Sequence, residues 1–160
     1  LFADFRAKAM ESLGAGANDS IMPLLNTAAV IGFGSVVTQT EGFSTFSQWV
    51  LDLPLPPLLS VFASVSVVSA IVGSGSGGLQ IFMQTFAERY LDMGVEPETL
   101  HRIATLGSGG IDSLPHCGAV IAMLTIMGLK HREAYKDIFV VTVAIPVIAT
   151  LTAIGLVSVL

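Results

Sequence analysis

Two short stretches of this sequence place polar or ionisable residues beside glycines within otherwise apolar surroundings. The first is Gly73-Ser-Gly-Ser-Gly-Gly78, and the second runs from Ser108-Gly-Gly110 through Asp112 and Ser113 to His116. Where a helix begins after such a break, its first N–H groups lack partners and can bind an anion. Asp112 and His116 carry side chains that can take up and release a proton. The residues therefore indicate recognition of a hydroxyl-bearing anion, with proton exchange close by.

The composition places these stretches in an unusual environment. Apolar residues make up 52% of the 160 residues and charged residues only 12%, against roughly a quarter in soluble domains. The mean hydropathy is +0.78, and the charges gather in a few short islands. Too little polar surface remains to cover the chain in water. We therefore expect an all-α integral membrane protein, multi-pass, in the cell (inner) membrane.

Several other classes of protein find no support in the sequence. The single cysteine, Cys117, cannot form an internal disulfide, and no CxxC motif or Cys/His cluster is present to hold a metal. No basic stripe points to nucleic acid. The sequence thus indicates no cofactor, no metal and no nucleic-acid partner. The chain begins Leu-Phe-Ala without an initiator Met, and we expect residues 1–160 to be the carboxy-terminal half of a longer protein.

Four apolar blocks define the elements that position the two breaks. Ser20–Thr40 has 21 residues and predicts a transmembrane helix of about 31 Å, and the uncharged run 138–160 predicts another. Leu53–Ala87 carries no charge over 35 residues, which is roughly 52 Å as one helix and too long for one crossing. Its glycine-rich centre predicts a re-entrant hairpin over about 54–90, whose second arm begins near Leu79. The break at 108–116 predicts a discontinuous helix over about 101–129.

Counting Lys and Arg leaves two topologies open. If the glycine-rich block is the re-entrant one, the cytoplasmic islands hold Arg6, Lys8, Lys130, Arg132 and Lys136, and Arg89 and Arg102 lie outside. If instead the 103–129 block is re-entrant, all of these residues lie inside. The second arrangement fits the charge rule slightly better. The first agrees with the net acidic character of island 88–102.

Irregular backbone within a membrane survives only where it is buried in protein or lines a wet cavity. The two breaks therefore predict a cavity near the bilayer midplane, with helix amino-termini facing an anionic substrate. Asp112 and His116 are the candidate sites for a coupling ion, because an ionisable group inside an apolar block is costly. The expected substrate-binding residues are Gly73, Ser74, Gly75, Ser76, Gly77, Ser108, Gly109, Gly110, Ser113 and His116.

Plainer interpretations stand beside these. The glycine-rich stretches could serve close helix packing alone. Asp112 could be the N-cap of the segment that follows it, and His116 could be a packed, hydrogen-bonded histidine. His101 and His131 lie in polar islands, where we expect them to be solvated.

Several motifs resemble the carboxy-terminal half of the gluconate permease family, within the larger ion-transporter group that includes citrate and dicarboxylate carriers. The most specific is Ser108-Gly-Gly-Ile-Asp-Ser-Leu-Pro-His116, and the others are Ile31-Gly-Phe-Gly34, Val72-Gly-Ser-Gly-Ser-Gly-Gly78, Leu100-His-Arg-Ile-Ala104 and Tyr135-Lys-Asp-Ile-Phe139. The resemblance covers nearly the whole chain. Cys117 departs from it, since Asn is expected after the histidine.

The resemblance implies symport of a small organic anion such as gluconate or another hydroxy-carboxylate, driven by protons through alternating access. A hairpin tip at 73–78 and a discontinuity at 108–116 would supply one half of the site. The implied partners are the anion, a coupling proton or sodium ion, the lipid bilayer and the missing amino-terminal half, and a homodimer is compatible with them. The alternatives are a sodium-coupled carboxylate transporter, a channel, or an intramembrane hydrolase that uses Ser113 and His116.

Overall fold

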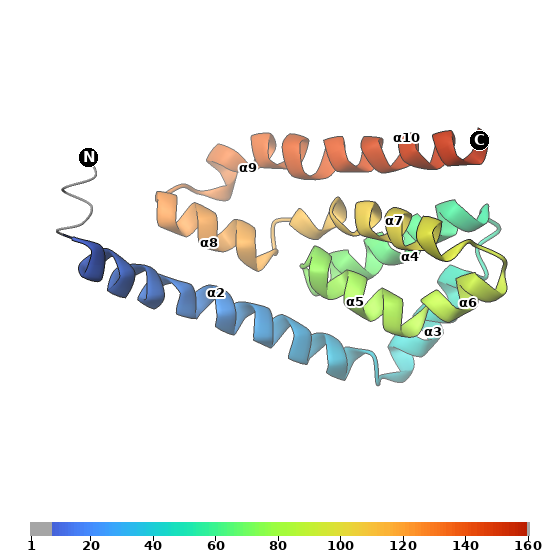
Figure 1. Cartoon of the computed structure of the whole chain (residues 1–160), viewed down its shortest axis with the longest axis horizontal. Helices are drawn as coiled ribbons and strands as arrows, with labels where there is room; N and C mark the ends of the chain where they lie inside the picture. The colour runs from blue at the N-terminus through green and yellow to red at the C-terminus, as the bar shows by residue number, and fades with distance from the viewer. Residues whose placement is uncertain (1–7, 160) are drawn as a thin grey trace.

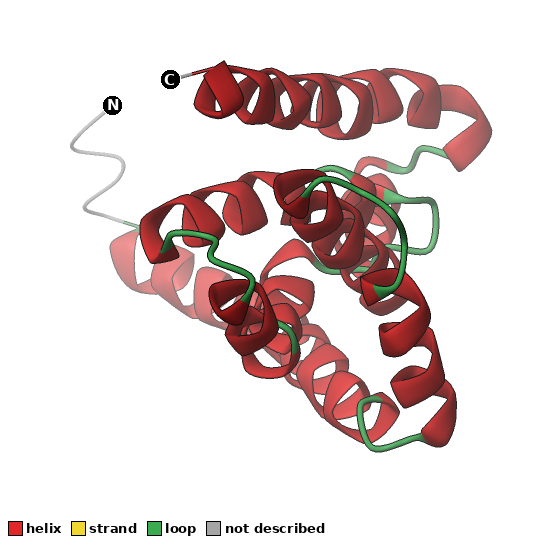
Figure 2. Cartoon of the chain, turned by 90° about the vertical axis from the view of Figure 1, so that its right-hand side faces the viewer, coloured by secondary structure: helices red, strands yellow, loops and turns green. Residues whose placement is uncertain are grey.

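The computed structural model describes residues 8–159, and within them only the backbone at 22, 23, 26, 27, 30 and 31. Residues 1–7, which belong to the predicted carboxy-terminal half, and residue 160, the last of the predicted span 138–160, lie outside the described part. That part consists of helices joined by turns and loops, and it contains no strand (Figure 2). Its elements are α2 (Ala9–Val37), α3 (Glu41–Leu51), α4 (Pro57–Val72), α5 (Gly75–Thr85), α6 (Ala87–Asp92), α7 (Pro97–Ser108), η1 (Ile111–Ser113), α8 (Gly118–Met127), α9 (His131–Phe139), η2 (Val140–Ala144) and α10 (Ile145–Val159).

Helix α4 lies at the centre and packs against α3, α5, α7, η1 and α10. It begins at Pro57, whose missing N–H costs nothing in a first turn, and ends at Gly73 in the left-handed conformation with φ 65°. The chain then folds back into α5, which packs along α4 as a helical hairpin. The core between these helices, α6 and α7 is built from Val61, Val65, Val68, Phe82, Phe86, Tyr90, Leu100 and Ile103.

The glycine-rich run differs from its predicted form. Only Gly73 and Ser74 lie outside helices, and Gly75 to Gly78 form the first turn of α5. The predicted start of the second arm, Leu79, is therefore wrong by four residues. The physical reason is the cap: the Ser74 hydroxyl accepts a hydrogen bond from the Gly77 amide at 3.2 Å, which stabilises a helix start that glycine alone disfavours. The glycines serve close packing as well, since Gly78 lies directly against Ser69 of α4.

The block predicted to be discontinuous is broken in the structure. Helices α7 and α8 follow one another across the middle of the molecule, with η1 and an irregular turn between them (Figure 1). The two parts, Pro97–Ser113 and Gly118–Met127, are bent by 49° and together are apolar enough for one span. Whether this block or the hairpin is re-entrant in a membrane stays a prediction.

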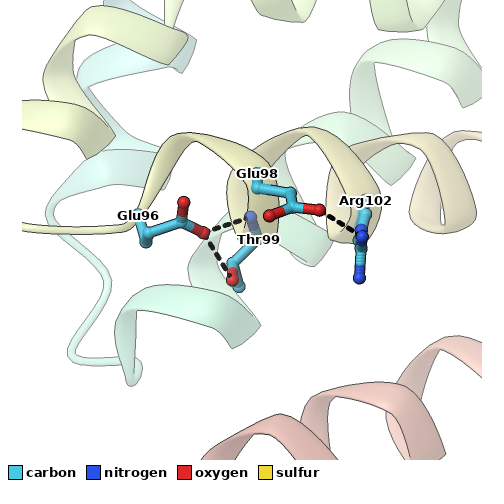
Figure 3. A network of polar contacts seen from close by, with 4 residues as sticks. All are labelled: Glu96, Glu98, Thr99 and Arg102. Atoms are coloured by element: carbon cyan, nitrogen blue, oxygen red, sulfur yellow. Dashed lines mark hydrogen bonds and ion pairs between the residues drawn. The ribbon is translucent and has the colours of Figure 1, made fainter.

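Helix α7 begins with a conventional cap outside the apolar block. The Glu96 carboxylate accepts hydrogen bonds from the Thr99 amide and hydroxyl, at 2.9 and 3.1 Å, and Arg102 pairs with Glu98 one turn further on (Figure 3). The bond from the Thr99 backbone holds the pKa of Glu96 below its usual value. A charged start of this kind fits the polar island that precedes the apolar helix.

Helices α9, η2 and α10 form one continuous helix along the upper edge of Figure 1. Among the described residues, His131–Val159 is the one helix long and apolar enough to cross a membrane by itself, with a mean hydropathy of 2.4 in its most apolar window. Only 17% of that window is buried, whereas the core helix of a soluble protein would be covered. The all-helical fold with this exposed apolar helix is compatible with a membrane protein.

The first predicted span falls within α2, a helix of 29 residues. Its backbone covers the predicted range from Ser20 to Val37, and Thr38 to Thr40 form the turn into α3. Some of its side chains lie outside the described residues, so the span stays a prediction.

Candidate functional site

The two glycine-rich breaks, which are separated by about thirty residues of sequence, meet in the structure. The amide of Gly75 at the start of α5 donates a hydrogen bond to Oδ2 of Asp112 in η1, at 3.1 Å. The tip of the hairpin also contacts the other end of the second break, where Gly73 lies against His116 and Cys117. The candidate site is therefore the junction between residues 73–78 and residues 108–117, which we call the break junction.

Asp112 is half-buried, and both of its carboxylate oxygens have partners. Oδ2 accepts from Gly75, and Oδ1 accepts from the Ser113 hydroxyl at 3.0 Å. The carboxylate thus lies at the positive amino-terminal end of α5, where a negative charge is favoured. The interpretation of Asp112 as the N-cap of the following helix is wrong, because Cys117 holds that position in α8. Asp112 instead binds the start of α5.

His116 is exposed at the edge of the break junction, and its ring is held from one side. Its Nε2 lies 2.7 Å from the carbonyl oxygen of Ala70, near the end of α4. A carbonyl can only accept, so Nε2 carries the proton in this contact. His116 is therefore hydrogen-bonded, as the plainer interpretation expected, and its side chain is exposed as well.

Hydroxyl and amide donors gather at the tip of the hairpin. Ser74 and Ser76 have their hydroxyl oxygens 3.5 Å apart, and Ser76 is exposed. The Gly77 amide is already bound by Ser74, which leaves less of the helix start to a ligand than the sequence suggests. Of the predicted tip residues, the exposed side chain of Ser76 lies most open to an incoming anion.

The glycines of the junction differ in how tightly they are enclosed. A Cβ at Gly75 would lie 2.8 Å from Oδ2 of Asp112 and 2.9 Å from the Ser108 carbonyl oxygen. At Gly110 it would meet a methyl group of Val147 at 3.0 Å, whereas at Gly109 its nearest neighbour would be the Leu106 carbonyl oxygen at 3.8 Å. Gly75 therefore permits close approach of α5 to the second break, and Gly110 permits close approach of the second break to α10. Gly109 has room for a side chain.

Ser108 and Ser113 do not turn their hydroxyls outwards. Ser108 is buried, and its hydroxyl donates to the carbonyl of Thr105 within α7 at 2.9 Å. The Ser113 hydroxyl is committed to Asp112. Their predicted contact with substrate has no support from the orientation of these side chains.

Two residues outside the predicted set also contact the second break. His131 of α9 donates through Nε2 to the Pro115 carbonyl at 2.9 Å, and the Tyr135 hydroxyl donates to the Ser113 carbonyl at 3.0 Å. The expectation that His131 is simply solvated is wrong in this respect. The motif Tyr135-Lys-Asp-Ile-Phe139 was the available signal, although the spacing alone does not indicate what Tyr135 contacts.

The described residues contain no group of three or more His, Cys, Asp or Glu side chains placed to hold a metal ion. A surface groove lined by Pro57, Leu58, Gly94 and Val157, among others, includes no residue of the break junction.

Comparison with known proteins gives one informative similarity. No protein-family model matches the chain, and no solved structure matches it. The chain is 36% identical over 140 residues to a protein of Bacillus subtilis (strain 168) named "Uncharacterized transporter YxjC". The match covers 85% of this chain but only 30% of that protein, so the chain spans less than a third of its relative's length. The chain is similar to part of a bacterial protein that is named as a transporter.

Proposed function

We propose that this chain is the carboxy-terminal part of a secondary active transporter that carries a small organic anion, such as gluconate or another hydroxy-carboxylate, together with protons. The observation that carries the proposal is the hydrogen bond between Gly75 and Asp112. It joins two helix breaks that are distant in sequence, whereas a bundle of unbroken helices would contain no such contact. Broken helices whose ends converge are the usual way in which transporters build an ion and substrate site.

The geometry suggests how anion and proton binding are linked. The ionised carboxylate of Asp112 occupies the positive end of α5, which is also where the carboxylate of a substrate would bind. Two negative charges at one helix start repel each other. Protonation of Asp112 would remove this competition, so uptake of a proton would favour binding of the anion. In this proposal the side chains of Ser76 and His116, which are both exposed, bind the hydroxyl groups of the substrate.

The similarity to a protein named as a transporter supports a transport function in general. A hydrolase based on Ser113 and His116 is not favoured, because the Ser113 hydroxyl donates to Asp112 and His116 bonds to Ala70. A sodium-coupled carboxylate transporter remains the second candidate, since carboxylate and carbonyl oxygens at the junction are also ligands for a hard cation.

The proposed setting is a multi-pass protein of the cell membrane, completed by an amino-terminal half with matching breaks. We propose the topology in which the hairpin is re-entrant and the broken helix crosses. It is supported by the folding back of α5 onto α4 and by the combined apolar character of α7 and α8, which are bent by 49° and would form one broken span. A homodimer is compatible with this arrangement.

The test is uptake by the full-length protein in proteoliposomes. Radiolabelled gluconate is supplied with an inward proton gradient, and separately with a sodium gradient at constant pH. We expect saturable accumulation above equilibrium with the proton gradient only. Accumulation that needs sodium would identify sodium, and not the proton, as the coupling ion. Flux that does not saturate would indicate a channel. If neither gluconate nor an excess of competing hydroxy-carboxylates binds or is accumulated, the substrate class is wrong.

A further inference from the structure

Two side chains of helix α9 form hydrogen bonds with backbone carbonyl groups of the second break. The break includes carbonyl groups that no regular helix satisfies, and each would be costly if left unpaired in an apolar environment. Tyr135 binds the carbonyl of Ser113 and His131 binds the carbonyl of Pro115. These two side chains lie one helical turn apart, with ring centroids 6.0 Å apart, so one face of α9 contacts two points of the break.

The contacts continue from α9 to the hairpin. Tyr135 binds the backbone of Ser113, the Ser113 hydroxyl binds one oxygen of Asp112, and the other oxygen accepts from Gly75. Asp112 is thus placed between α5 on one side and a residue held by α9 on the other. A shift of α9 would move Ser113 first and the carboxylate of Asp112 with it.

We propose that Tyr135 and His131 are positioning residues, which set the geometry of Asp112 and His116 by holding the break between α9 and the hairpin. Only the purpose of this positioning, which is to shape a transport site, rests on the proposed function. Neither side chain needs to touch the substrate. Among the described residues, the irregular segment between Ser113 and Cys117 has one internal backbone bond, from the Cys117 amide to Leu114 at 2.8 Å. The hydrogen bonds that hold it from outside come from α9 on one side and, through His116 and Ala70, from the end of α4 on the other.

The chain contains its own reporter for this arrangement. Cys117, the single cysteine of the 160 residues, is buried with 5% exposure and packs in a small cluster with Val120, Leu124 and the α9 residues Ala134, Tyr135 and Ile138. If α9 separates from the break, the Cys117 thiol becomes accessible. Its rate of alkylation therefore measures the contact without any knowledge of the substrate.

The experiment follows alkylation of Cys117 by N-ethylmaleimide in the purified full-length protein, read by mass spectrometry of the peptide that contains it. Tyr135→Phe removes only the hydroxyl, and His131→Ala removes the second contact. We expect each to raise the rate roughly three- to tenfold, as for the loss of one hydrogen bond that limits local opening. His131→Gln keeps a donor and should restore much of the protection.

The matched control is Tyr90→Phe, which changes the other tyrosine of the chain. Tyr90 is buried and its hydroxyl bonds to Ser60 and Ser64 at 2.8 and 2.6 Å, away from the break. It should lower the melting temperature and leave the alkylation rate of Cys117 unchanged. An unchanged rate in both α9 variants, or an equal rise in Tyr90→Phe, would overturn the positioning role.

Transport provides a second readout once a substrate is accepted. Tyr135→Phe should raise the KM for gluconate with a smaller change in maximal rate, and its effect should not add to that of Asp112→Asn, because both act on the same carboxylate. Additive effects would contradict the link through Ser113. Absence of gluconate uptake in the unmodified protein would count against the proposed function alone, since the alkylation result stands independently.

Discussion

The carboxylate of Asp112 accepts a hydrogen bond from the backbone amide of Gly75 at 3.1 Å, across 37 positions of sequence. A helix start and an acidic side chain from two separate breaks therefore satisfy each other. This contact joins the hairpin to the broken helix.

Gly75→Ala is expected to disturb the break junction, although alanine is the smallest possible addition. The new methyl group would lie within 3 Å of both the Asp112 carboxylate and the Ser108 carbonyl, so the elements must separate. Uptake by the full-length protein should fall at least tenfold with normal membrane insertion. Gly109→Ala is the matched control, since its nearest neighbour would be 3.8 Å away, and it should retain uptake. Normal transport in Gly75→Ala would show that the close contact is not needed.

Asp112→Asn is expected to separate binding from coupling. An asparagine side chain can still accept from Gly75 through its oxygen and offer its amide group to the Ser113 hydroxyl, so the local structure should persist. Proton-driven accumulation should fail, whereas exchange of internal for external substrate should survive with little dependence on pH. Both activities are measured in proteoliposomes at several values of the external pH. Intact accumulation would remove Asp112 from the proton pathway, and loss of both activities would assign it to substrate binding or folding.

Gly78→Ala is expected to destabilise the hairpin itself. A Cβ at this position would lie 2.4 Å from the Cα of Ser69, and backbone cannot give way as a side chain can. Overpacking of this kind costs about 1–3 kcal/mol or more. Gly34→Ala provides the comparison, because the nearest neighbour of its Cβ would be the terminal methyl of Ile81, at 2.5 Å, which can rotate aside. Thermal unfolding in detergent should show a clear drop for Gly78→Ala and a small one for Gly34→Ala; equal melting temperatures would contradict the packing.

The topology can be tested by labelling single cysteines introduced at exposed positions in intact cells. If the hairpin is re-entrant, Glu41→Cys and Glu96→Cys should both react with a membrane-impermeant maleimide from outside, and Lys130→Cys only after the membrane is opened. The polar islands hold these residues in accessible positions. Reaction of Glu96→Cys from the cytoplasmic side would favour the other arrangement, in which the 103–129 block is re-entrant.

Local residue preferences account for the helical, apolar character of the chain and for the places where its helices break. Glycine, proline and charge act locally, so the turn at Gly73, the break after Ser108 and the start of α8 at Gly118 could be predicted from the residues there. The apolar run before Leu160 likewise predicts the exposed helix that ends at Val159.

The groups that meet at the breaks are selected by the packing of the folded chain. Whether Asp112 caps the helix that follows it or the helix that begins at Gly75 depends on how α4, α5 and η1 pack, and local preference is the same in both cases. The partners of His131 and Tyr135 are backbone carbonyls, which every residue possesses, so no side-chain pattern identifies them. Long-range contacts between one side chain and an irregular backbone are set by packing geometry, and that geometry is a property of the folded chain.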